Sequence, residues 1–332
     1  MRRVAILGAG GMGTALGLLL SKAVADVRLW SRDPEHAAQF ARTRINERHL
    51  PEITVPESLR ITAAAAKAIG EAELVVAAVP TSYLRATLES LAHEIPARLP
   101  FLSVVKGIEY GTFARPSQII QEALGPRPVA VLSGPSHAEE LAQGLPASVV
   151  VSGTDLVLVN QIRDVLSHDA FRVYTSTDAL GVELAGALKN ILGIAAGICD
   201  GLESGDNAKA ALLTRGLVEI ARLGLELGAR LETFYGLAGV GDVVTTCYSP
   251  YGRNRSVGQR IGRGETLERV LGEMVNVAEG VPTTRSVHSL AQKRGVDMPI
   301  TAELYKILFE GKPPRSAVVD LMVRQPKVEW QW

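Results

Sequence analysis

The sequence predicts an α/β fold, in which a doubly wound, mainly parallel sheet is followed by an all-α C-terminal domain. Short runs rich in β-branched residues alternate with helical patterns up to about residue 177, and beyond that point only helical patterns remain. A turn with four glycines joins the first strand to the first helix. We therefore expect two domains, residues 1–177 and residues 178–332, packed directly with a cleft where ligands usually bind.

The composition is that of a globular chain with a large core. Of 332 residues, 47% are apolar and 21% are charged, and 35 lysines and arginines balance 35 aspartates and glutamates. This balance predicts neither a nucleic-acid partner nor a polybasic membrane surface. Cys199 and Cys247 are far apart and the histidines are scattered, so we expect no disulfide, no metal and a reducing cytoplasmic compartment. The apolar stretch Val4–Leu20 imitates a secretory signal, but glycines interrupt it, so we expect no membrane insertion.

The expected elements of the first domain alternate between strand and helix. The predicted strands are Val4–Leu7, Val27–Trp30, Leu74–Val79, Phe101–Val104, Val129–Leu132, Ser148–Val151 and Arg172–Tyr174. The predicted helices between them are Met12–Ala23, Pro34–Arg44, Ser82–Leu91, Ser117–Leu124, Ser136–Gln143 and Asp155–Leu166. The predicted helices of the second domain are Asp178–Ile198, Lys209–Leu227, Val257–Arg263, Leu267–Met274, Thr284–Arg294 and Ala302–Phe309.

The glycine turn has the spacing of a dinucleotide-binding site. Gly8-Ala9-Gly10-Gly11-Met12-Gly13 fits G-x-G-x-x-G between a strand and an amphipathic helix, which is the context that gives this motif meaning. Gly8 allows the tight turn, Gly10 lets the backbone approach the pyrophosphate, and Gly13 lets helix and strand pack closely. The helix N-terminus attracts the negative charge. The motif predicts a Rossmann-type domain that binds a nicotinamide cofactor.

The end of the second strand bears on which cofactor binds. An acidic residue there bonds the ribose 2′-hydroxyl of NAD, whereas an arginine accommodates the 2′-phosphate of NADP. Here the strand ends in Trp30-Ser31-Arg32, and Asp33-Pro34 has the pattern of a helix N-cap. The pattern favours NADP(H) and leaves NAD(H) open.

A lysine lies in the most apolar helix. Segment Asp178–Ile198 is apolar on almost every face, which predicts a buried helix, and Lys189-Asn190 lies in its middle. A desolvated ammonium is suited to acid–base catalysis near neutral pH. The alternative is a lysine that extends to an exposed edge. Glu183 and Asn190 share a face of this helix, and Lys189 points about 100° away from Asn190.

Two later segments carry groups that suit a charged substrate. The glycine-rich stretch 236–241 leads to Asp242, which either caps a helix or orients the lysine ammonium. Further on, the guanidiniums of Arg253 and Arg255 and the amide of Asn254 open a helix, an arrangement that suits a phosphate group. For an isolated arginine pair, a solvated basic turn would be the commoner interpretation.

Two predicted strand ends carry further candidates. Lys106 follows the strand Phe101–Val104, at the edge where doubly wound sheets bind ligands. The next strand is followed by Gly134-Pro135-Ser136-His137-Ala138, where the backbone enters a helix and offers free N–H groups. His137 is a candidate base, but a single histidine at a helix start is at least as often structural.

Taken together, these segments resemble the soluble NAD(P)-dependent glycerol-3-phosphate dehydrogenases of bacterial type over essentially the whole chain. The strings that carry the resemblance are GAGGMGTAL, SVVKGIE, LSGPSHAEE, ALKNILGIAAGICDGL, LAGVGDVVTTC, GRNR and NVAEGV. The resemblance implies a Rossmann domain joined to a helical domain, and reversible reduction of dihydroxyacetone phosphate to sn-glycerol 3-phosphate. A preference for NADPH points to the synthesis of glycerol 3-phosphate, which supplies glycerophospholipid synthesis. For the oligomeric state, a homodimer is the commonest expectation.

The resemblance also implies roles for single residues. Lys189 matches the family's proton donor and acceptor, with Asp242 beside it at the substrate. Further positions that match substrate contacts are Lys106, Gly134, Ser136, Gly252, Arg253 and Asn254. Beyond the glycine turn's Gly8, Gly10 and Gly13, the positions that match cofactor contacts are Gly11, Met12, Arg32, Lys106, Ala138, Arg253, Val277 and Glu279. Gly252 is a departure, because relatives often carry a serine there whose hydroxyl is missing in this chain.

Two other functions stay open on the residues alone. One is a reductase of the same architecture that acts on a hydroxy acid, whose carboxylate Arg253 would hold. The other is an NADPH-binding regulator without catalysis, which should lack a lysine in the cleft. Lys189 and Asp242 argue against the regulator.

Overall fold

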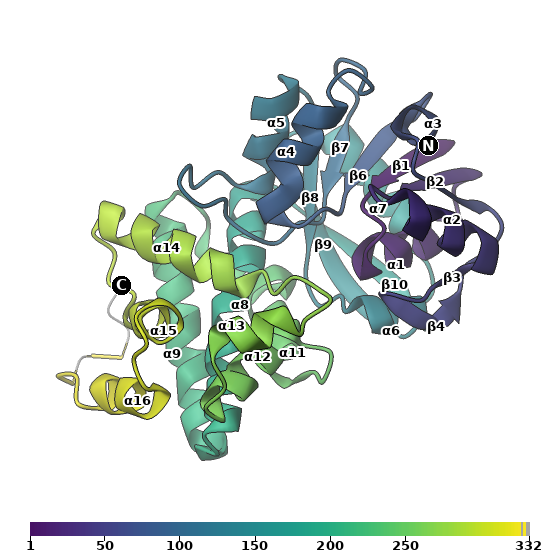
Figure 1. The fold of residues 1–332 in the computed structure, drawn as a ribbon. Coiled ribbons are helices and arrows are strands. Elements are labelled where there is room, and N and C mark those ends of the chain that lie inside the picture. The colour runs from purple at the N-terminus through teal and green to yellow at the C-terminus, as the bar shows by residue number, and fades with distance from the viewer. Residues whose placement is uncertain (327, 330–332) are drawn as a thin grey trace. The chain divides into compact units, whose positions relative to one another are not determined.

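The computed structural model describes residues 1–326 and 328–329 (Figure 1). The chain divides into two compact units, Met1–Lys106 with Arg115–Glu183 and Gly107–Ala114 with Leu184–Trp332. The first unit is a mostly parallel sheet with helices and the second is helical, so the predicted fold class is confirmed. Segment Gly107–Ala114 belongs to the second unit although it lies between two elements of the first, and no local pattern in the sequence indicates this.

The first unit holds an eight-stranded sheet of order β10-β9-β8-β7-β6-β1-β2-β5. Its strands are β1 (Arg3–Leu7), β2 (Asp26–Trp30), β5 (Leu59–Thr62), β6 (Leu74–Ala77), β7 (Phe101–Ser103), β8 (Val129–Ser133), β9 (Ala147–Gly153) and β10 (Phe171–Ser176). Neighbouring strands are parallel except β8 and β9, which are antiparallel. A separate antiparallel pair, β3 (Ile45–Asn46) and β4 (Leu50–Thr54), precedes β5. All seven predicted strands are present, whereas β3, β4 and β5 were not predicted.

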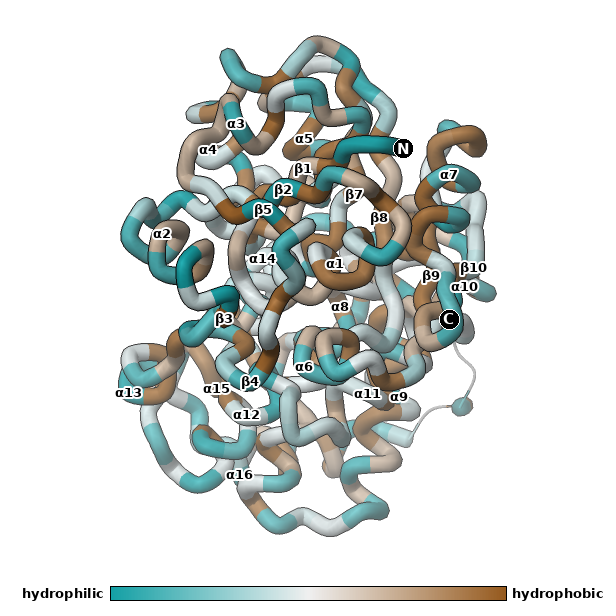
Figure 2. Tube along the Cα trace, turned by 90° about the vertical axis from the view of Figure 1, so that its right-hand side faces the viewer, coloured by the Kyte–Doolittle hydropathy of each residue, from teal (hydrophilic) through white to brown (hydrophobic). Residues whose placement is uncertain are grey.

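Helices cover both faces of this sheet. They are α1 (Gly11–Leu20), α2 (Pro34–Thr43), α3 (Ala65–Ile69), α4 (Thr81–Leu91), α5 (Pro116–Leu124), α6 (Ala138–Ala142) and α7 (Leu156–Leu166). Val4 and Ile6 of β1 join one hydrophobic cluster with Leu16 and Leu19 of α1. The alternate residues of β1 are buried as well, as expected for a strand covered on both sides. Figure 2 shows the contrast between the apolar α1 and the more hydrophilic α2.

The strand order places the glycine turn at the point where the chain direction across the sheet reverses. Strand β1 pairs with β2 on one side and with β6 on the other, and the chain adds later strands in opposite directions from this point. In open α/β sheets, ligands bind at the carboxyl ends of the strands beside such a switch point. Residues 8–13 follow β1 at this edge.

The second unit takes up the chain at Leu184, inside helix α8, and is helical from there on. The helices are α8 (Ala179–Gly201), α9 (Gly205–Glu226), α10 (Leu231–Tyr235), the π-helical turn η1 (Leu237–Gly241), α11 (Asp242–Tyr248), α12 (Arg253–Gly262), α13 (Leu267–Gly272), α14 (Gly280–Arg294), α15 (Pro299–Phe309) and α16 (Pro314–Met322). Helix α8 is long and apolar enough to cross a bilayer, yet the whole of its most apolar stretch is buried within the protein, as in a core helix. The predicted burial of this helix is confirmed.

Candidate functional site

The glycine turn after β1 has a shape that only glycine permits at two positions. Gly8 has a φ of 114°, and a Cβ there would lie 2.8 Å from the Ala78 carbonyl oxygen. A Cβ on Gly13 would lie 1.9 Å from the Gly8 carbonyl oxygen, so this glycine lets α1 start directly against the turn. A Cβ on Gly10 would meet nothing within 4 Å. The turn therefore leaves an open approach at Gly10, just before α1, which fits a pyrophosphate.

The start of α1 lies against the start of α6. A Cβ on Gly11 would lie 3.3 Å from the Cβ of Ala138, and Met12 beside it is half-buried. The structure thus brings together three residues that the sequence places in the cofactor site.

The loop after β2 separates the roles of its charged residues. Asp33 accepts hydrogen bonds from the backbone N–H groups of Glu35 and His36, at 3.0 and 3.1 Å, and so caps α2. These bonds, that of His36 first, hold the pKa of Asp33 below its usual range. The N-cap interpretation of Asp33 is confirmed. The neighbouring Arg32 is exposed, with its guanidinium 5.8 Å from the ring centre of Tyr83.

The ends of β7 and β8 meet through Lys106. Its ammonium donates to the Gly134 carbonyl oxygen at 3.0 Å and to the Ser136 hydroxyl at 3.3 Å. Gly134 has a φ of 124°, which turns the chain after β8, and His137 is the N-cap residue of α6. The three predicted substrate contacts of the first unit therefore form one cluster.

Lys189 of the second unit is buried in an ion pair. Its side chain is 9% exposed, and Nζ lies 3.1 Å from Oδ1 of Asp242, whose side chain is 3% exposed. Nζ also donates to the Thr246 hydroxyl. Burying an ammonium without a partner would be costly, and the carboxylate offsets that cost. The alternative of a lysine that extends to an exposed edge is wrong.

The π-helical turn delivers Asp242 to this pair. Helix α11 begins at Asp242 itself, with Gly241 at the N-cap, so the carboxylate faces Lys189 rather than closing the helix end. Thr246 lies one turn further along the same face of α11. Thr246 was not predicted from the sequence, although its spacing of four from Asp242 was a signal. Burial raises the pKa of the Cys247 thiol to about 12, so this neighbour stays protonated and is no nucleophile.

The start of α12 holds the amide and one of the two guanidiniums predicted there. Asn254 donates from Nδ2 to Oδ1 of Asn190 and accepts from the Gly280 N–H, both at 2.9 Å. Exposed Arg253 donates to the Val277 carbonyl oxygen at 3.1 Å, and Glu279 follows at the N-cap of α14. Hydrogen bonds therefore tie Asn254 to α8 and to the start of α14, and Arg253 to Val277.

Arg255 does not take the phosphate-binding role that its sequence neighbourhood predicts. Its Nε lies 2.6 Å from Oδ2 of Asp200, which also binds the ammonium of Lys209. The guanidinium is committed to this network, so only Arg253 of the pair is exposed. Gly252 is the N-cap of α12 and gives no side-chain cap, and a Cβ there would lie 2.8 Å from the Thr246 carbonyl oxygen.

Glu183 belongs to the first unit. Its carboxylate binds the guanidinium of Arg115 and the N–H and hydroxyl groups of Ser117, where α5 begins. It therefore anchors α5, and Asn190 instead pairs with Asn254.

Glycines allow α8 and α12 to touch through their backbones. A Cβ on Gly197 would lie 2.0 Å from the Arg255 carbonyl oxygen, and a Cβ on Gly258 would lie 1.9 Å from the Ile194 carbonyl oxygen. A Cβ on Gly193 would lie 3.2 Å from the Cβ of Asn254. This close approach holds the start of α12 beside the part of α8 that carries Lys189.

A Rossmann unit with an open glycine turn and a helical unit with a buried lysine–aspartate pair define a class, the two-domain nicotinamide-dependent dehydrogenases. The family model of the NAD-dependent glycerol-3-phosphate dehydrogenase N-terminus matches residues 3–158, and that of the C-terminus matches residues 178–319. The chain belongs to the NAD-dependent glycerol-3-phosphate dehydrogenase family.

Individual relatives match over the full length. The chain is 46% identical to the glycerol-3-phosphate dehydrogenase [NAD(P)+] of Chlorobium phaeobacteroides (strain BS1), over 98% of this chain and 99% of the relative. It is 47% identical to that of Chlorobium limicola (strain DSM 245 / NBRC 103803 / 6330), with the same coverage. The crystal structure of glycerol-3-phosphate dehydrogenase from Coxiella burnetii superposes with a TM-score of 0.94 at 37% identity, covering 97% of this chain and 99% of that one. The chain is thus an NAD(P)-dependent oxidoreductase that reduces dihydroxyacetone phosphate to glycerol 3-phosphate.

Proposed function

We propose that Lys189 is the group that gives a proton to the substrate carbonyl and takes it back in the oxidative direction. The buried ion pair of Lys189 with Asp242, 3.1 Å apart, is the observation that carries this proposal. A lysine that is desolvated and held by a carboxylate and a hydroxyl has a fixed position and orientation, as a proton donor requires. Asp242 orients the ammonium and balances its charge.

The reaction needs one hydride and one proton. When bound, the nicotinamide supplies the hydride that forms the new C–H bond at the ketone carbon. Lys189 donates the proton to the carbonyl oxygen, so that the ketone becomes a secondary alcohol and the ammonium becomes a neutral amine. Asp242 and Thr246 keep the amine in place until it takes a proton from water.

The remaining predicted contacts hold the substrate. Arg253 and Asn254 bind its phosphate at the start of α12, and binding energy gained there orients the carbonyl for reaction. Lys106, held by Gly134 and Ser136, is a further substrate contact. Asn254 already donates one amide proton to Asn190, so it offers the phosphate its other proton. The glycine at position 252 offers no hydroxyl, so α12 would bind phosphate through Arg253, Asn254 and backbone N–H groups.

The cofactor we propose is NADP(H) in preference to NAD(H). Arg32 is exposed at the end of β2, where a guanidinium suits a 2′-phosphate, while Asp33 is occupied as a helix cap. The pyrophosphate would rest on residues 8–13, with further contacts to the cofactor from Ala138, Val277, Glu279 and Arg253.

A preference for NADPH favours the synthetic direction, so we infer that the product supplies glycerophospholipid synthesis. We also infer a soluble cytoplasmic enzyme, without nucleic-acid partners or membrane insertion, that forms a homodimer. Size-exclusion chromatography with light scattering tests the dimer.

Substrate and cofactor are tested by one assay. NADPH and NADH oxidation is followed with dihydroxyacetone phosphate and with a panel of 2-keto acids. Of these substrates, we expect only dihydroxyacetone phosphate to be turned over. We expect a higher kcat/KM with NADPH than with NADH. Faster turnover of a keto acid would overturn the substrate, and equal or better use of NADH would overturn the cofactor preference.

A further inference from the structure

A buried chain of hydrogen bonds connects two loops of the first unit that are far apart in sequence. The Asn46 amide donates from Nδ2 to the Ala9 carbonyl oxygen at 3.0 Å and to the Thr14 hydroxyl at 2.8 Å. Its Oδ1 lies 3.1 Å from Nε2 of His36, and Nδ1 of His36 lies 3.2 Å from the Ser31 hydroxyl. The chain thus runs from the glycine turn to the end of β2.

The chemistry of the groups fixes the direction of the bonds that Asn46 makes. The Ala9 carbonyl oxygen can only accept, so the atom of Asn46 that faces it must be the amide nitrogen. Oδ1 of Asn46 therefore faces His36, which must donate from Nε2. In the neutral imidazole Nδ1 is then an acceptor, and the single proton of the Ser31 hydroxyl is shared between Nδ1 and the Asp33 carbonyl oxygen, each 3.2 Å away.

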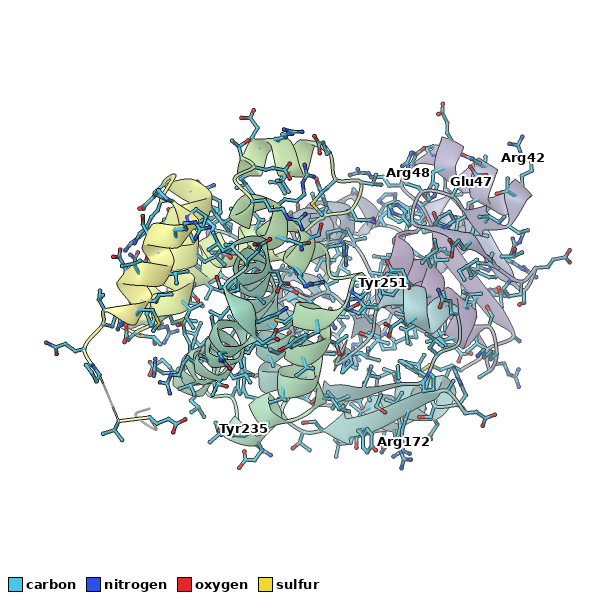
Figure 3. The ribbon with its side chains drawn as sticks, turned by 90° about the horizontal axis from the view of Figure 1, so that it is seen from below. Arg42, Glu47, Arg48, Arg172, Tyr235 and Tyr251 are labelled. Atoms are coloured by element: carbon cyan, nitrogen blue, oxygen red, sulfur yellow. The ribbon has the colours of Figure 1, made fainter. Side chains whose placement is uncertain are left out.

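These groups are withdrawn from water. Asn46 is 0% exposed, Ser31 is 4% exposed and His36 is 9% exposed. Buried polar groups without partners are costly, so each member depends on its neighbours. The next residues after Asn46, Glu47 and Arg48, are exposed, and Figure 3 shows both with Arg42 at the outside of the unit.

Asn46 reaches the glycine turn because of the hairpin formed by β3 and β4. Asn46 lies in β3 and pairs with Leu50 of β4. The carbonyl oxygen of His49, in the turn between them, would lie 3.7 Å from a Cβ on Gly11. The hairpin therefore contacts the glycine turn at Ala9 through a side chain and lies beside Gly11 through its backbone.

We propose that Asn46 and His36 are positioning residues for the dinucleotide. Asn46 fixes the Ala9 carbonyl and with it the course of the turn between Gly8 and Gly10. His36 holds Ser31 together with the Asp33 backbone. The neighbour of Ser31, Arg32, is the contact to the 2′-phosphate, so this half of the inference rests on the proposed preference for NADP(H). This chain of hydrogen bonds joins the glycine turn and the end of β2 into one rigid element.

The test is a fluorescence titration of NADPH and of NADH without substrate. Asn46→Asp keeps the shape but turns the donor towards Ala9 into an acceptor, so we expect Kd to rise at least tenfold for both cofactors. His36→Phe keeps the ring between Phe40 and His49 but removes both nitrogens. We expect this variant to raise Kd for NADPH at least fivefold and more than Kd for NADH. Asn207→Asp, the same change at an exposed asparagine of α9, is the matched control and should bind as wild type.

A second pair of variants covers the case in which Asn46→Asp does not fold. Thr14→Val removes the hydroxyl that accepts from Asn46, and Thr14→Ser keeps it. We expect Kd for both cofactors to rise about threefold in the first and to stay as wild type in the second.

Melting temperature and kcat at saturating cofactor separate a positioning role from a merely structural one. Variants that are folded at the assay temperature, bind more weakly and keep kcat within threefold support the inference. The inference is overturned if Kd is unchanged in Asn46→Asp and His36→Phe. If Asn46→Asp does not fold, an unchanged Kd in Thr14→Val overturns it instead. A loss of kcat at unchanged Kd also overturns it. If wild-type protein binds NADPH no more tightly than NADH, the proposed cofactor preference is overturned instead. The role of Asn46 is then still decided by Kd for NADH.

Discussion

Gly258→Ala tests whether the backbone contact between α8 and α12 holds the catalytic arrangement of the second unit. Gly258 lies in the middle of α12, four residues after Asn254, and its α-carbon faces the backbone of α8. The added Cβ would lie 1.9 Å from the Ile194 carbonyl oxygen and 2.9 Å from the backbone nitrogen of Ile198. Both contacts are with backbone atoms, which cannot rotate away.

The magnitude follows from the distances. Cβ contacts under 3.0 Å essentially do not occur, so the two helices must separate by roughly 1 Å. The bond of 2.9 Å between Asn254 and Asn190 then stretches beyond the range of a hydrogen bond. Overpacking costs about 1–3 kcal/mol and the lost bond about 1 kcal/mol, against a gain of up to about 1 kcal/mol from replacing a helical glycine. We expect a net loss of about 2 kcal/mol in the free energy of unfolding.

The assay combines urea unfolding with steady-state kinetics. Displacing the start of α12 by about 1 Å should lower kcat/KM for dihydroxyacetone phosphate by about 10–100-fold. KM for the cofactor should stay close to that of wild type. Gly272→Ala is the matched control, because a Cβ at the end of α13 would meet nothing within 4 Å. Wild-type stability and kinetics in Gly258→Ala would refute the reasoning.

Three further predictions concern single side chains. Arg253→Ala should raise KM for dihydroxyacetone phosphate about 10–100-fold, through loss of a charge-assisted hydrogen bond, whereas Arg263→Ala at the exposed end of the same helix should not; equal effects would contradict the phosphate role. Arg32→Ala should raise KM for NADPH about tenfold and leave KM for NADH unchanged, and a parallel rise in both would exclude a 2′-phosphate contact. Burial raises the pKa of Glu219 from 4.5 to about 7. The folded state therefore binds this proton more tightly than the unfolded state does. The free energy of unfolding should fall by up to about 3 kcal/mol as pH rises from about 4.5 to 7. Urea unfolding at pH 5 and pH 8 should show this loss in wild type and less of it in Glu219→Gln, and identical pH dependence of the two would contradict it.

Local sequence patterns were sufficient where one segment determines its own structure. The turn at Gly8 was predictable because its φ and its close contacts demand glycine at fixed spacing. Asp33 was predictable as a cap because the bonds that it accepts come from residues two and three positions later. Lys189 was predictable because a single ammonium in an apolar helix needs a partner, and a glycine-rich turn with Asp242 offered one.

Patterns failed where distant segments decide the structure. The sequence next to Arg253 predicts that Arg255 binds phosphate, but its guanidinium forms an ion pair with Asp200 on another helix. Segment Gly107–Ala114 joins the second unit through partners far along the chain, such as Ser286, whose hydroxyl donates to the Ile108 carbonyl oxygen. The hairpin of β3 and β4 was missed because its strands are short and partly polar, and its register depends on a bulge.

The central claim is that Lys189 moves the proton, and Lys189→Ala tests it most directly. The variant is checked for folding by circular dichroism, and turnover of dihydroxyacetone phosphate with NADPH is compared with Kd for NADPH measured without substrate. Lys293→Ala, at an exposed lysine of α14, is the control. We expect kcat of Lys189→Ala to fall by about 10²–10⁴-fold, while Kd for NADPH stays within twofold of wild type. Turnover within tenfold of wild type would contradict the account.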